Sequence, residues 1–359
     1  MRPEDMLLDE ETLFRDESVF TPSYIPTDFM HRDSQIREIV LSLKPGIRGY
    51  NPLNLLLCGP PATGKTTALK YVFREVRENT SKLITVYVNC EDSSTPYSIF
   101  AKIYEKVYGI SPPSTGKPLE DIKWRIFTKL KRDDRSIVIA LDELDRLFLN
   151  NYIAEILVDL LKSHSTHGYD RVGIIGVMIS QDMIVELNEK TRSVFNPSRV
   201  FFQGYREDEI FDILENRVKH GFYPDVISKE LLRLVSRKTF EGGDLRMGID
   251  LLRKSALIAE HDSLRRIEKK HIEQAMKSLA YGRREELIRK ISDDARNLLS
   301  IIERNNKLAS GEIYEKFRNE TNIGIKKYNQ FIKELEFAGL ISSIYEKGRG
   351  RKRRFILKI

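Results

Sequence analysis

The sequence predicts a layered α/β domain with a parallel sheet, then an all-helical unit, then a small C-terminal domain of helices and a β-hairpin. Short apolar runs alternate with amphipathic helical patterns through the first half of the chain. From residue 207 the strand patterns stop, and they return only near the C-terminus. The 359 residues are 41% hydrophobic and 31% charged, the balance of an ordinary globular protein with room for two or three domains.

The first domain, residues 1–203, is expected to hold five buried parallel strands, at 53–58, 83–89, 137–141, 172–179 and 199–202. Helices with one apolar face are expected between them, at 66–79, 97–108, 119–131 and 153–163. A Pro/Gly/Ser-rich loop at 109–117 falls within region 104–122. This region is longer than the short connection that a sheet domain needs, so we interpret it as an insertion.

Helical periodicity fills the second domain, residues 204–282, with helices expected at 207–220, 228–240, 245–261 and 269–280. In the third domain, residues 283–359, helices are expected at 285–305, 310–319 and 325–338, and strands at 341–345 and 355–358. Ser310 is expected to cap its helix, and Gly339 to end the last one. Two helices with a β-hairpin appended form a winged helix, a DNA-binding fold.

Composition and apolar run lengths exclude several classes of protein. Two cysteines are too few for a disulfide scaffold, a cysteine zinc site or an iron–sulfur cluster. The longest apolar run, at 172–179, is far short of the about 20 residues that span a bilayer. The first residues lack the basic and then apolar profile of a signal peptide. We therefore expect a cytoplasmic protein with no membrane partner.

The excess of positive charge lies at one end of the chain. Residues 283–359 hold 19 Lys/Arg and 11 Asp/Glu, a net charge of +8, whereas residues 1–282 carry −1. Six of the eight residues at 347–354 are Lys or Arg. This asymmetry indicates that the third domain binds a polyanion such as DNA. The alternative is a solvated basic tail.

Residues 59–66, GPPATGKT, match the pattern G-x-x-x-x-G-K-[ST] directly after an expected strand and at the start of an expected helix. In such a P-loop the backbone amides surround the β-phosphate at a positive helix end. Lys65 would contact the β- and γ-phosphates, and the hydroxyl of Thr66 would bind Mg²⁺. The pattern predicts ATP or ADP and Mg²⁺ as ligands, held by Gly59, Pro60, Pro61, Ala62, Thr63, Gly64, Lys65 and Thr66.

A pair of acidic residues, Asp142 and Glu143, follows the buried strand expected at 137–141. A carboxylate at the C-terminal end of such a strand lies beside the phosphate loop in parallel sheets. Asp142 is expected to hold Mg²⁺, and Glu143 to act as the general base on the attacking water. Asp145 is interpreted as structural, or as a charge at a helix N-terminus.

These motifs together resemble a known family. The P-loop, the run LDELD at 141–145, GDLR at 243–246 and DLLR at 250–253 look like an AAA+ ATPase. They resemble, more narrowly, the archaeal replication initiators related to the eukaryotic origin recognition complex and cell division control protein 6. The segment 20–32, FTPSYIPTDFMHR, is similar to a segment that lines the nucleotide pocket in that family. The resemblance covers residues 13–359 and implies an AAA+ base, a helical lid and a winged helix.

The resemblance also implies roles for residues of the lid and base. Arg246 falls at the sensor-2 position, where a lid arginine reaches the γ-phosphate. Tyr205 would pack near the adenine, and Arg217 would neutralise phosphate. Arg192 matches the region of an arginine finger that acts on a neighbouring subunit; Arg199 is the second candidate.

One position departs from the family pattern. Gln181 stands where the family usually has an Asn that orients the attacking water, the sensor-1 residue. Its side chain is one methylene longer, which alters its reach to that water. We therefore expect ATP hydrolysis that is slow, regulated or limited to a single turnover, and that serves as a switch rather than a fast motor.

The expected DNA contacts lie on the outer side of the helix at 325–338 and on the wing. The core-facing stripe of that helix is Ile325, Tyr328, Phe331, Ile332 and Leu335. The outward residues, with donors for phosphates and base edges, are Lys326, Lys327, Asn329, Gln330 and Lys333. The wing adds Arg349, Arg351, Lys352, Arg353 and Arg354. The alternative is a winged helix that binds protein. The insertion resembles an initiator-specific DNA contact, in which Lys117 and Lys123 would meet phosphates; the alternative is a solvent-exposed elaboration.

Two functional hypotheses follow, and a third is disfavoured. The first is an ATP-gated initiator that binds duplex DNA at replication origins, with other initiator subunits and the replicative helicase as partners, in association with the nucleoid. The second is a nucleotide-switched winged-helix transcription regulator. The third is a scaffold with an inactive P-loop, against which the intact Lys65, Thr66, Asp142 and Glu143 argue.

Overall fold

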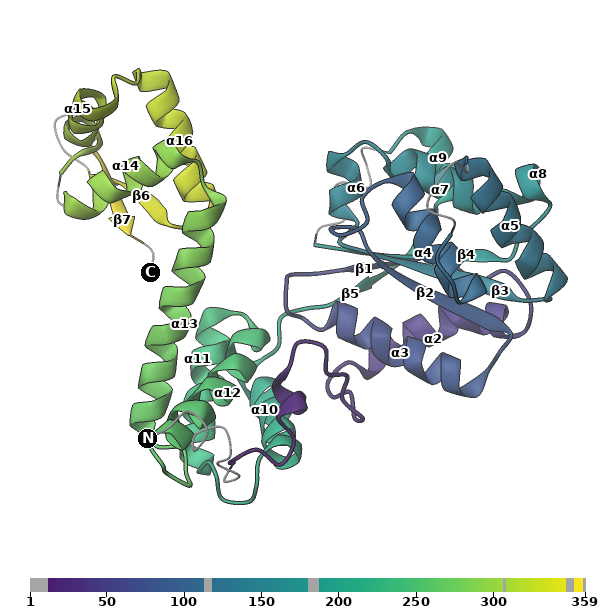
Figure 1. The fold of residues 1–359 in the computed structure, drawn as a ribbon, viewed down its shortest axis with the longest axis horizontal. Coiled ribbons are helices and arrows are strands. Elements are labelled where there is room, and N and C mark those ends of the chain that lie inside the picture. The colour runs from purple at the N-terminus through teal and green to yellow at the C-terminus, as the bar shows by residue number, and fades with distance from the viewer. Residues whose placement is uncertain (1–11, 113–117, 180–186, 306–307, 347–351, 358–359) are drawn as a thin grey trace. The chain divides into compact units, whose positions relative to one another are not determined.

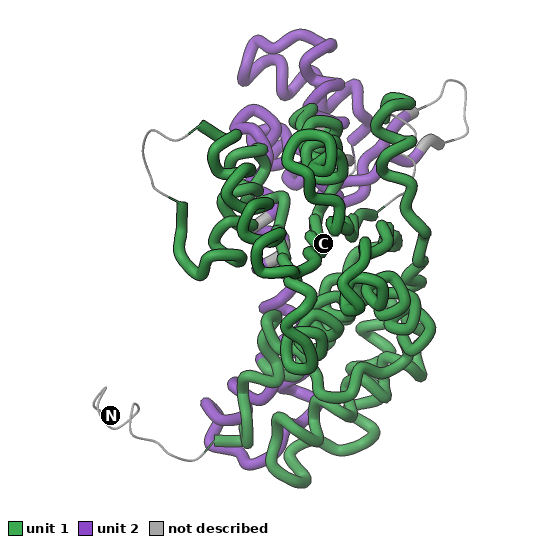
Figure 2. Tube along the Cα trace, turned by 90° about the vertical axis from the view of Figure 1, so that its right-hand side faces the viewer, with its two compact units in different colours: residues 1–253 green, residues 254–359 purple. Residues whose placement is uncertain are grey.

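The computed structural model describes residues 12–112, 118–179, 187–305, 308–346 and 352–357. The chain divides into two compact units, residues 1–253 and 254–359, which Figure 2 colours separately. This division lies inside helix α12 (Leu245–His261), so it coincides with neither boundary predicted from the sequence. The boundary predicted at residue 282 falls inside α13 (Lys269–Lys290). A continuous helix therefore occupies the place where a change of domain was expected.

A five-stranded parallel sheet forms the centre of the first unit, in the order β2-β3-β4-β1-β5. The strands are β1 (Leu55–Cys58), β2 (Leu83–Asn89), β3 (Ser136–Asp142), β4 (Val172–Met178) and β5 (Ser198–Phe201). Every residue of β1, β3 and β4 is buried. Continuous apolar strands of this kind are typical of a parallel sheet that is covered on both faces. All five strands predicted from the sequence are confirmed to within two residues at each end.

Two helical layers cover the sheet, as Figure 1 shows. One face packs against α2 (Asp33–Ile47) and α3 (Lys65–Asn79), with Leu55 and Leu57 turned toward them. The other packs against α4 (Pro96–Tyr108), α5 (Leu119–Arg132) and α7 (Ile153–Leu161), with Leu56 turned toward them. The side-chain alternation of a strand divides the core in this way. Shorter helices α6 (Asp145–Leu149), α8 (Ser163–His167) and α9 (Glu189–Val194) complete the layer.

The lid part of the first unit contains α10 (Glu207–Gly221), α11 (Lys229–Gly242) and the start of α12. A short 3₁₀ helix, η1 (Glu17–Phe20), lies against the end of α10 through stacked rings of Phe20 and Phe222, whose centroids are 4.5 Å apart. A Cβ atom at residue Gly221 would lie 2.3 Å from the Phe20 ring, so only glycine permits this contact. Residues 17–20 are thereby fixed beside the lid.

The second unit holds α13, α14 (Asp293–Arg304), α15 (Ser310–Thr321), α16 (Ile325–Phe337) and the antiparallel pair β6 (Ile341–Glu346) and β7 (Lys352–Leu357). Its core gathers apolar side chains from α14, α15, α16 and both strands, with Phe317, Ile332 and Leu335 fully buried. Helices packed on a hairpin match the expected winged helix. Gly339, at φ 73°, ends α16 as predicted.

Three details of the second unit differ from the sequence predictions. The prediction of one helix over 285–305 was wrong. The side chain of Ser292 accepts a hydrogen bond from the amide of Ala295, so α14 begins there as a separate helix. Ser310 is not a cap; the amide of Ala309 donates instead to Glu312, at 2.8 Å. Ile325 does not face the core and is 49% exposed, because it opens α16 before the packed part of the helix begins.

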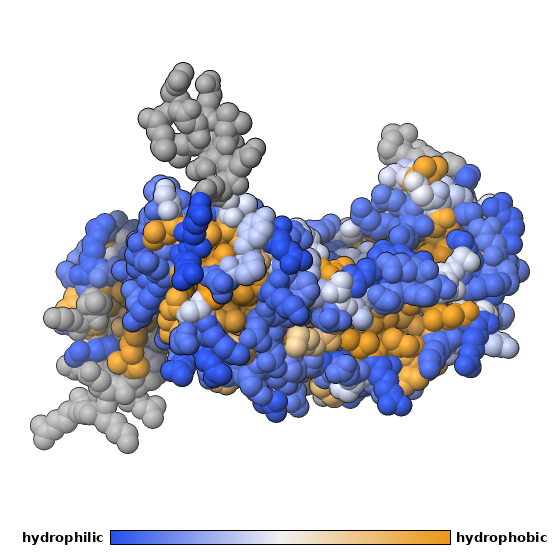
Figure 3. Space-filling model, turned by 90° about the horizontal axis from the view of Figure 1, so that it is seen from below, coloured by the Kyte–Doolittle hydropathy of each residue, from blue (hydrophilic) through white to orange (hydrophobic). Residues whose placement is uncertain are grey.

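Among the residues described, no helix is long and apolar enough to cross a membrane. Hydrophilic residues dominate the face seen in Figure 3, with apolar side chains showing in patches between them. Such mixing is ordinary for a protein surface.

Candidate nucleotide-binding site

The P-loop connects β1 to α3 and has a backbone that its glycines permit. Gly59 and Gly64 have φ values of 149° and 92°. A Cβ atom on Gly59 would lie 2.1 Å from the carbonyl oxygen of Phe202, and one on Gly64 would lie 2.6 Å from the hydroxyl of Tyr205. The loop therefore keeps its amides accessible at the start of α3, where the first N–H groups of the helix lack intrahelical acceptors.

Lys65 is buried and has its ammonium over the loop. Its Nζ donates to the carbonyl oxygens of Gly59 and Pro60, at 2.6 and 2.7 Å. Burial lowers the pKa of the Lys65 ammonium, while the carboxylates of Asp142 and Glu143 oppose that effect. The cation is thus held at the mouth of the loop by weak neutral acceptors that phosphate oxygens would replace.

Asp142, the last residue of β3, is 4% exposed and bonded on both oxygens. Its Oδ2 accepts from the hydroxyls of Thr66 and Tyr87, each at 2.7 Å, and its Oδ1 accepts from the amide of Glu143. The structure thus brings together the two residues predicted to hold Mg²⁺. A hydroxyl and a carboxylate are the oxygen donors that this ion prefers, so the site fits it. Tyr87 was not among the site residues predicted from the sequence.

Glu143 lies at the exposed rim of the site with a φ of 55°, in the left-handed region. Such backbone strain in a non-glycine residue is often found at functional sites. Partial burial, and then the charges of Asp142 and Asp145, raise the pKa of its carboxyl. Asp145 begins α6 and accepts from the amide of Ile179, so its predicted structural role is confirmed.

A pocket of about 330 Å³ extends from the P-loop to the lid. Its wall includes the N-terminal arm, by which we mean residues 20–32, as the family resemblance implied. The residues that line it are Phe20, Thr21, Pro22, Tyr24, Pro26, Asp28, Phe29, Met30, Pro61, Ala62, Thr63, Gly64, Lys65, Thr66, Thr67, Asp142, Glu143, Val177, Met178, Ile179, Tyr205, Ile213, Asn216, Arg217, Leu245, Arg246, Ile249 and Asp250. Phosphate-binding and apolar groups therefore share one cavity, as a nucleotide requires.

The predicted lid residues reach this pocket in different ways. Tyr205 is buried against Gly64. Arg217 is buried, donates to the carbonyl oxygen of Val19 and lies 4.4 Å from the ring of Tyr24, so it meets the N-terminal arm. Burial lowers the pKa of Arg217. Arg246 lines the pocket with a side chain that is 64% exposed.

The other predicted catalytic positions lie outside the pocket or outside the described residues. Arg192 in α9 and Arg199 in β5 are exposed, as a residue that acts on a neighbouring subunit must be. Gln181 lies outside the described residues. The roles of these three residues stay predictions.

Comparison with known proteins places the chain in a family. Residues 48–177 match an AAA domain, and residues 211–277 match the Cdc6 AAA+ ATPase-type lid domain. The ORC1-type DNA replication protein 2 of Methanosarcina mazei is 37% identical over 354 residues, which cover 99% of this chain and 95% of the relative. The ORC1-type DNA replication protein 2 of Methanothermobacter thermautotrophicus is 36% identical over 340 residues, which cover 94% of this chain and 90% of the relative. This chain belongs to the ORC1-type DNA replication proteins. The resemblance found in the sequence is confirmed.

Solved structures agree with this family. The Aeropyrum pernix ORC1 protein in complex with DNA has a TM-score of 0.80 and 27% identity, covering 97% of this chain and 94% of that one. The A. pernix ORC2 protein, solved as ADPNP-ADP complexes, has a TM-score of 0.67 and 22% identity, covering 95% of this chain and 94% of that one. At this identity the similarity supports a shared fold only. The chain is thus an AAA+ replication initiator of the ORC1 type with a C-terminal winged helix.

The winged helix of this ORC1-type protein presents part of the predicted DNA-binding set. Lys326, Lys327, Asn329, Gln330 and Lys333 are all exposed on α16. Tyr328, Ile332 and Leu335 are buried on its opposite side, as predicted, and Phe331 is half-buried. The helix therefore has the two faces that the sequence indicated, and its contact with DNA stays a prediction.

The wing differs from the prediction. Arg353 is not a free DNA contact: its guanidinium donates to Ser343 at 2.7 Å and to Glu336 of α16 at 3.0 Å. This ion pair fixes β7 against α16. Arg354 is half-buried. Arg349 and Arg351 lie outside the described residues, as does the side chain of Lys352.

The predicted role of Lys123 in the insertion was wrong. Lys123 is 5% exposed, and its ammonium donates to Glu120 and Asp159 at 2.7 and 2.5 Å. It lies 5.3 Å from the ring of Phe100. A cation enclosed by two carboxylates and a ring has no access to a phosphate, so Lys123 is structural. Lys117 lies outside the described residues.

Proposed function

We propose that this ORC1-type protein binds ATP and Mg²⁺ in its pocket and binds duplex DNA at replication origins. Slow hydrolysis would switch it between conformations. The observation that carries the proposal is the hydrogen bond from Thr66 to Asp142 within a pocket that the lid also lines. This pair supplies a cation site beside the P-loop, where the phosphates of a nucleotide would end.

Each residue of the pocket has a role in this proposal. Thr66 and Asp142 would hold Mg²⁺, which supplies charge neutralisation on the phosphates. Lys65 would exchange its two carbonyl acceptors for phosphate oxygens, a stronger charge-assisted contact. Glu143 at the rim would take a proton from the attacking water. Its raised pKa makes it a better base than an ordinary glutamate.

The lid residues would report which nucleotide is bound. Arg246 lines the same pocket as Lys65, and its side chain is exposed enough to move toward a γ-phosphate.

Arg192 would complete the site of a neighbouring initiator subunit. Gln181 would place the attacking water less closely than the usual Asn, which keeps hydrolysis slow. These features suit a switch rather than a motor.

DNA binding would use the exposed face of α16 and the basic wing. The A. pernix ORC1 protein was solved in complex with DNA, and the similarity to it covers 97% of this chain. Three lysines on one helix face suit phosphate contacts, and the amides of Asn329 and Gln330 suit base edges. The protein would act at the nucleoid and aid loading of the replicative helicase.

Lys65→Ala separates nucleotide binding from DNA binding. The variant should lose ATP binding, measured with a fluorescent nucleotide, and keep most of its salt-sensitive DNA affinity. Lys102→Ala removes an exposed lysine of α4 and is the matched control. Loss of both activities in Lys65→Ala would contradict separate sites.

Immunoprecipitation of the protein with its DNA from its own cells tests the place of action. Enrichment where DNA synthesis begins supports the initiator. Enrichment at many promoters and at no replication start would support the transcription regulator instead.

A further inference from the structure

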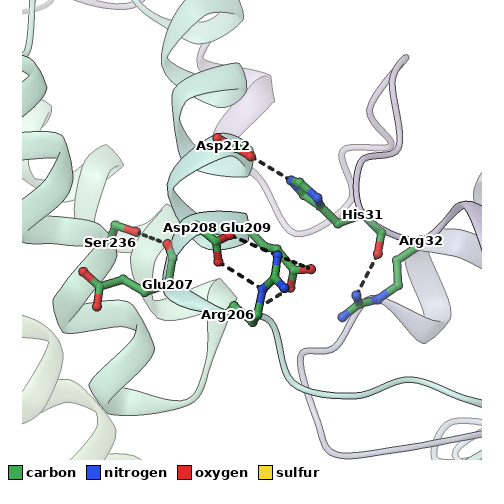
Figure 4. Close-up of polar contacts among 8 residues, drawn as sticks. All are labelled: His31, Arg32, Arg206, Glu207, Asp208, Glu209, Asp212 and Ser236. Atoms are coloured by element: carbon green, nitrogen blue, oxygen red, sulfur yellow. Dashed lines mark hydrogen bonds and ion pairs between the residues drawn. The ribbon is translucent and has the colours of Figure 1, made fainter.

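Arg32 holds three segments of the first unit together from a buried position. It precedes α2 and is only 4% exposed. Its Nε donates to the carbonyl oxygen of Thr63 in the P-loop, at 3.2 Å. Its Nη2 donates to the carbonyl oxygen of Gln203, at 2.7 Å, in the connection between β5 and α10. The third donor, Nη1, bonds the neighbouring carbonyl oxygen of His31, at 2.8 Å (Figure 4).

The flat side of the same guanidinium covers an aromatic ring. Its Cζ lies 3.7 Å from the ring centroid of Tyr205, two residues beyond Gln203. The hydroxyl of that tyrosine lies against Gly64, the P-loop residue that follows Thr63. Arg32 therefore meets the P-loop directly through Thr63 and indirectly through Tyr205.

The residue before Arg32 contacts the lid itself. Nε2 of His31 lies 3.1 Å from Oδ2 of Asp212, on the second turn of α10 (Figure 4). His31 has a φ of 61°, so its backbone is held in the left-handed region. Two adjacent side chains thus connect the N-terminal arm to the P-loop on one side and to α10 on the other.

A guanidinium suits this position for a physical reason. Its planar fork holds several donors at fixed angles, whereas an ammonium is a point charge. The guanidinium is buried, and burying a charge costs free energy. Its hydrogen bonds to the carbonyl oxygens of Thr63, His31 and Gln203 offset that cost, so the position is stable only while these bonds persist. If the P-loop shifts and breaks the hydrogen bond to Thr63, the guanidinium of Arg32 must find another acceptor. Its hydrogen bond to Gln203, where the lid begins, is then also altered.

We infer that Arg32 is a positioning residue that transmits the conformation of the P-loop to the lid through Gln203 and Tyr205. This inference rests on the proposed function, because the signal it transmits is the presence of nucleotide. Arg32 acts through backbone groups and a ring. Its contribution is therefore separate from that of Arg246, which lines the pocket from the lid.

The test measures nucleotide binding and lid movement in the same full-length protein. Both cysteines are buried, so cysteines introduced at the exposed residues Glu78 in α3 and Lys219 in α10 accept a pair of fluorophores. ATP affinity and the ATP-induced change in energy transfer are then recorded for the labelled parent, Arg32→Ala and Arg32→Lys. Arg206→Ala is the control, because Arg206 is 72% exposed and pairs with Asp208 and Glu209 of its own helix (Figure 4).

We expect both Arg32 variants to bind ATP no more than about tenfold more weakly than the parent, because Lys65 and Thr66 remain. Their change in energy transfer should fall to less than half of the parent's, while Arg206→Ala keeps it. Arg32→Lys retains the charge, and it carries the test if Arg32→Ala does not fold.

The inference would be overturned if ATP changed the energy transfer in both Arg32 variants as much as it does in the labelled parent. Complete loss of ATP binding in a folded variant would also overturn it, since Arg32 would then be a binding residue. Failure of the labelled parent to bind ATP would instead refute the proposed function, and it is seen before any variant is measured.

Discussion

Replacing Tyr87 with Phe removes one of the two hydroxyl donors to Oδ2 of Asp142 while keeping the ring. Burial, and then the charge of Asp142, raise the pKa of Tyr87, so the phenol is a neutral donor at physiological pH. A hydrogen bond to a charged group contributes about 1.5–3 kcal/mol. Asp142 is 4% exposed, so water replaces the lost donor poorly. We expect a loss of about 2 kcal/mol in the free energy of unfolding.

Thermal unfolding followed by circular dichroism measures this loss. For a unit of this size each kcal/mol shifts Tm by about 2–4 °C, so Tyr87→Phe should unfold about 4–8 °C lower. Tyr97→Phe is the control: its ring is 41% exposed on α4, and its change should stay within about 0.5 kcal/mol. A Tm for Tyr87→Phe equal to that of the control would refute the stated role of the phenol.

The same substitution should affect the cation site. With Asp142 less firmly oriented, the affinity for Mg²⁺ in the presence of ATP should fall by about tenfold, the smaller effect typical of groups that orient a metal ligand. Binding of ATP without Mg²⁺ should not change, because Lys65 and the loop amides are untouched. Equal losses in both titrations would indicate general damage to the pocket.

Two further predictions concern hydrolysis and DNA. The pKa of Glu143 is raised, and a general base works only when it is ionised. As the pH falls, ATPase activity should therefore be lost at a higher pH than an ordinary glutamate would give, and Glu143→Gln should abolish the activity. Loss of activity only at the pH of an ordinary glutamate would contradict the assignment of Glu143 as the base. Replacing Lys326, Lys327 and Lys333 with Ala should flatten the salt dependence of DNA binding by up to about 2.7 in the log–log slope, at about 0.9 for each phosphate contact. Lys123→Ala should leave that slope unchanged, because its ammonium is enclosed; a flatter slope would restore Lys123 to the DNA contacts.

The sheet and the phosphate loop were predictable because their signals are local. A buried parallel strand is apolar along its whole length, as β1, β3 and β4 are. The P-loop motif is specific because glycine, lysine and threonine each answer a separate physical need at that turn. The acidic pair after β3 followed from the rule that carboxyl ends of parallel strands share one edge.

The residues that support the site were not predictable in the same way. Arg32 is 31 residues from Thr63 and 171 from Gln203 along the chain, and its sequence context is that of a surface arginine. Tyr87 contacts Asp142 from a neighbouring strand whose pairing no local pattern reveals. Lys123 was misassigned for the same reason, because a charged helix residue looks exposed in the sequence until Asp159, 36 residues away, is placed beside it.

The continuity of α13 sets a rule for how this part of the chain tolerates changes in length. Its 22 residues extend for about 33 Å at 1.5 Å per residue. Inserting one residue in a helix turns everything beyond it by about 100° around the axis, while the translation is only about 1.5 Å. Seven residues nearly restore the original azimuth, with an error of about 20°. A flexible linker absorbs single insertions, but α13 converts each one into a rotation of the winged helix relative to Lys269.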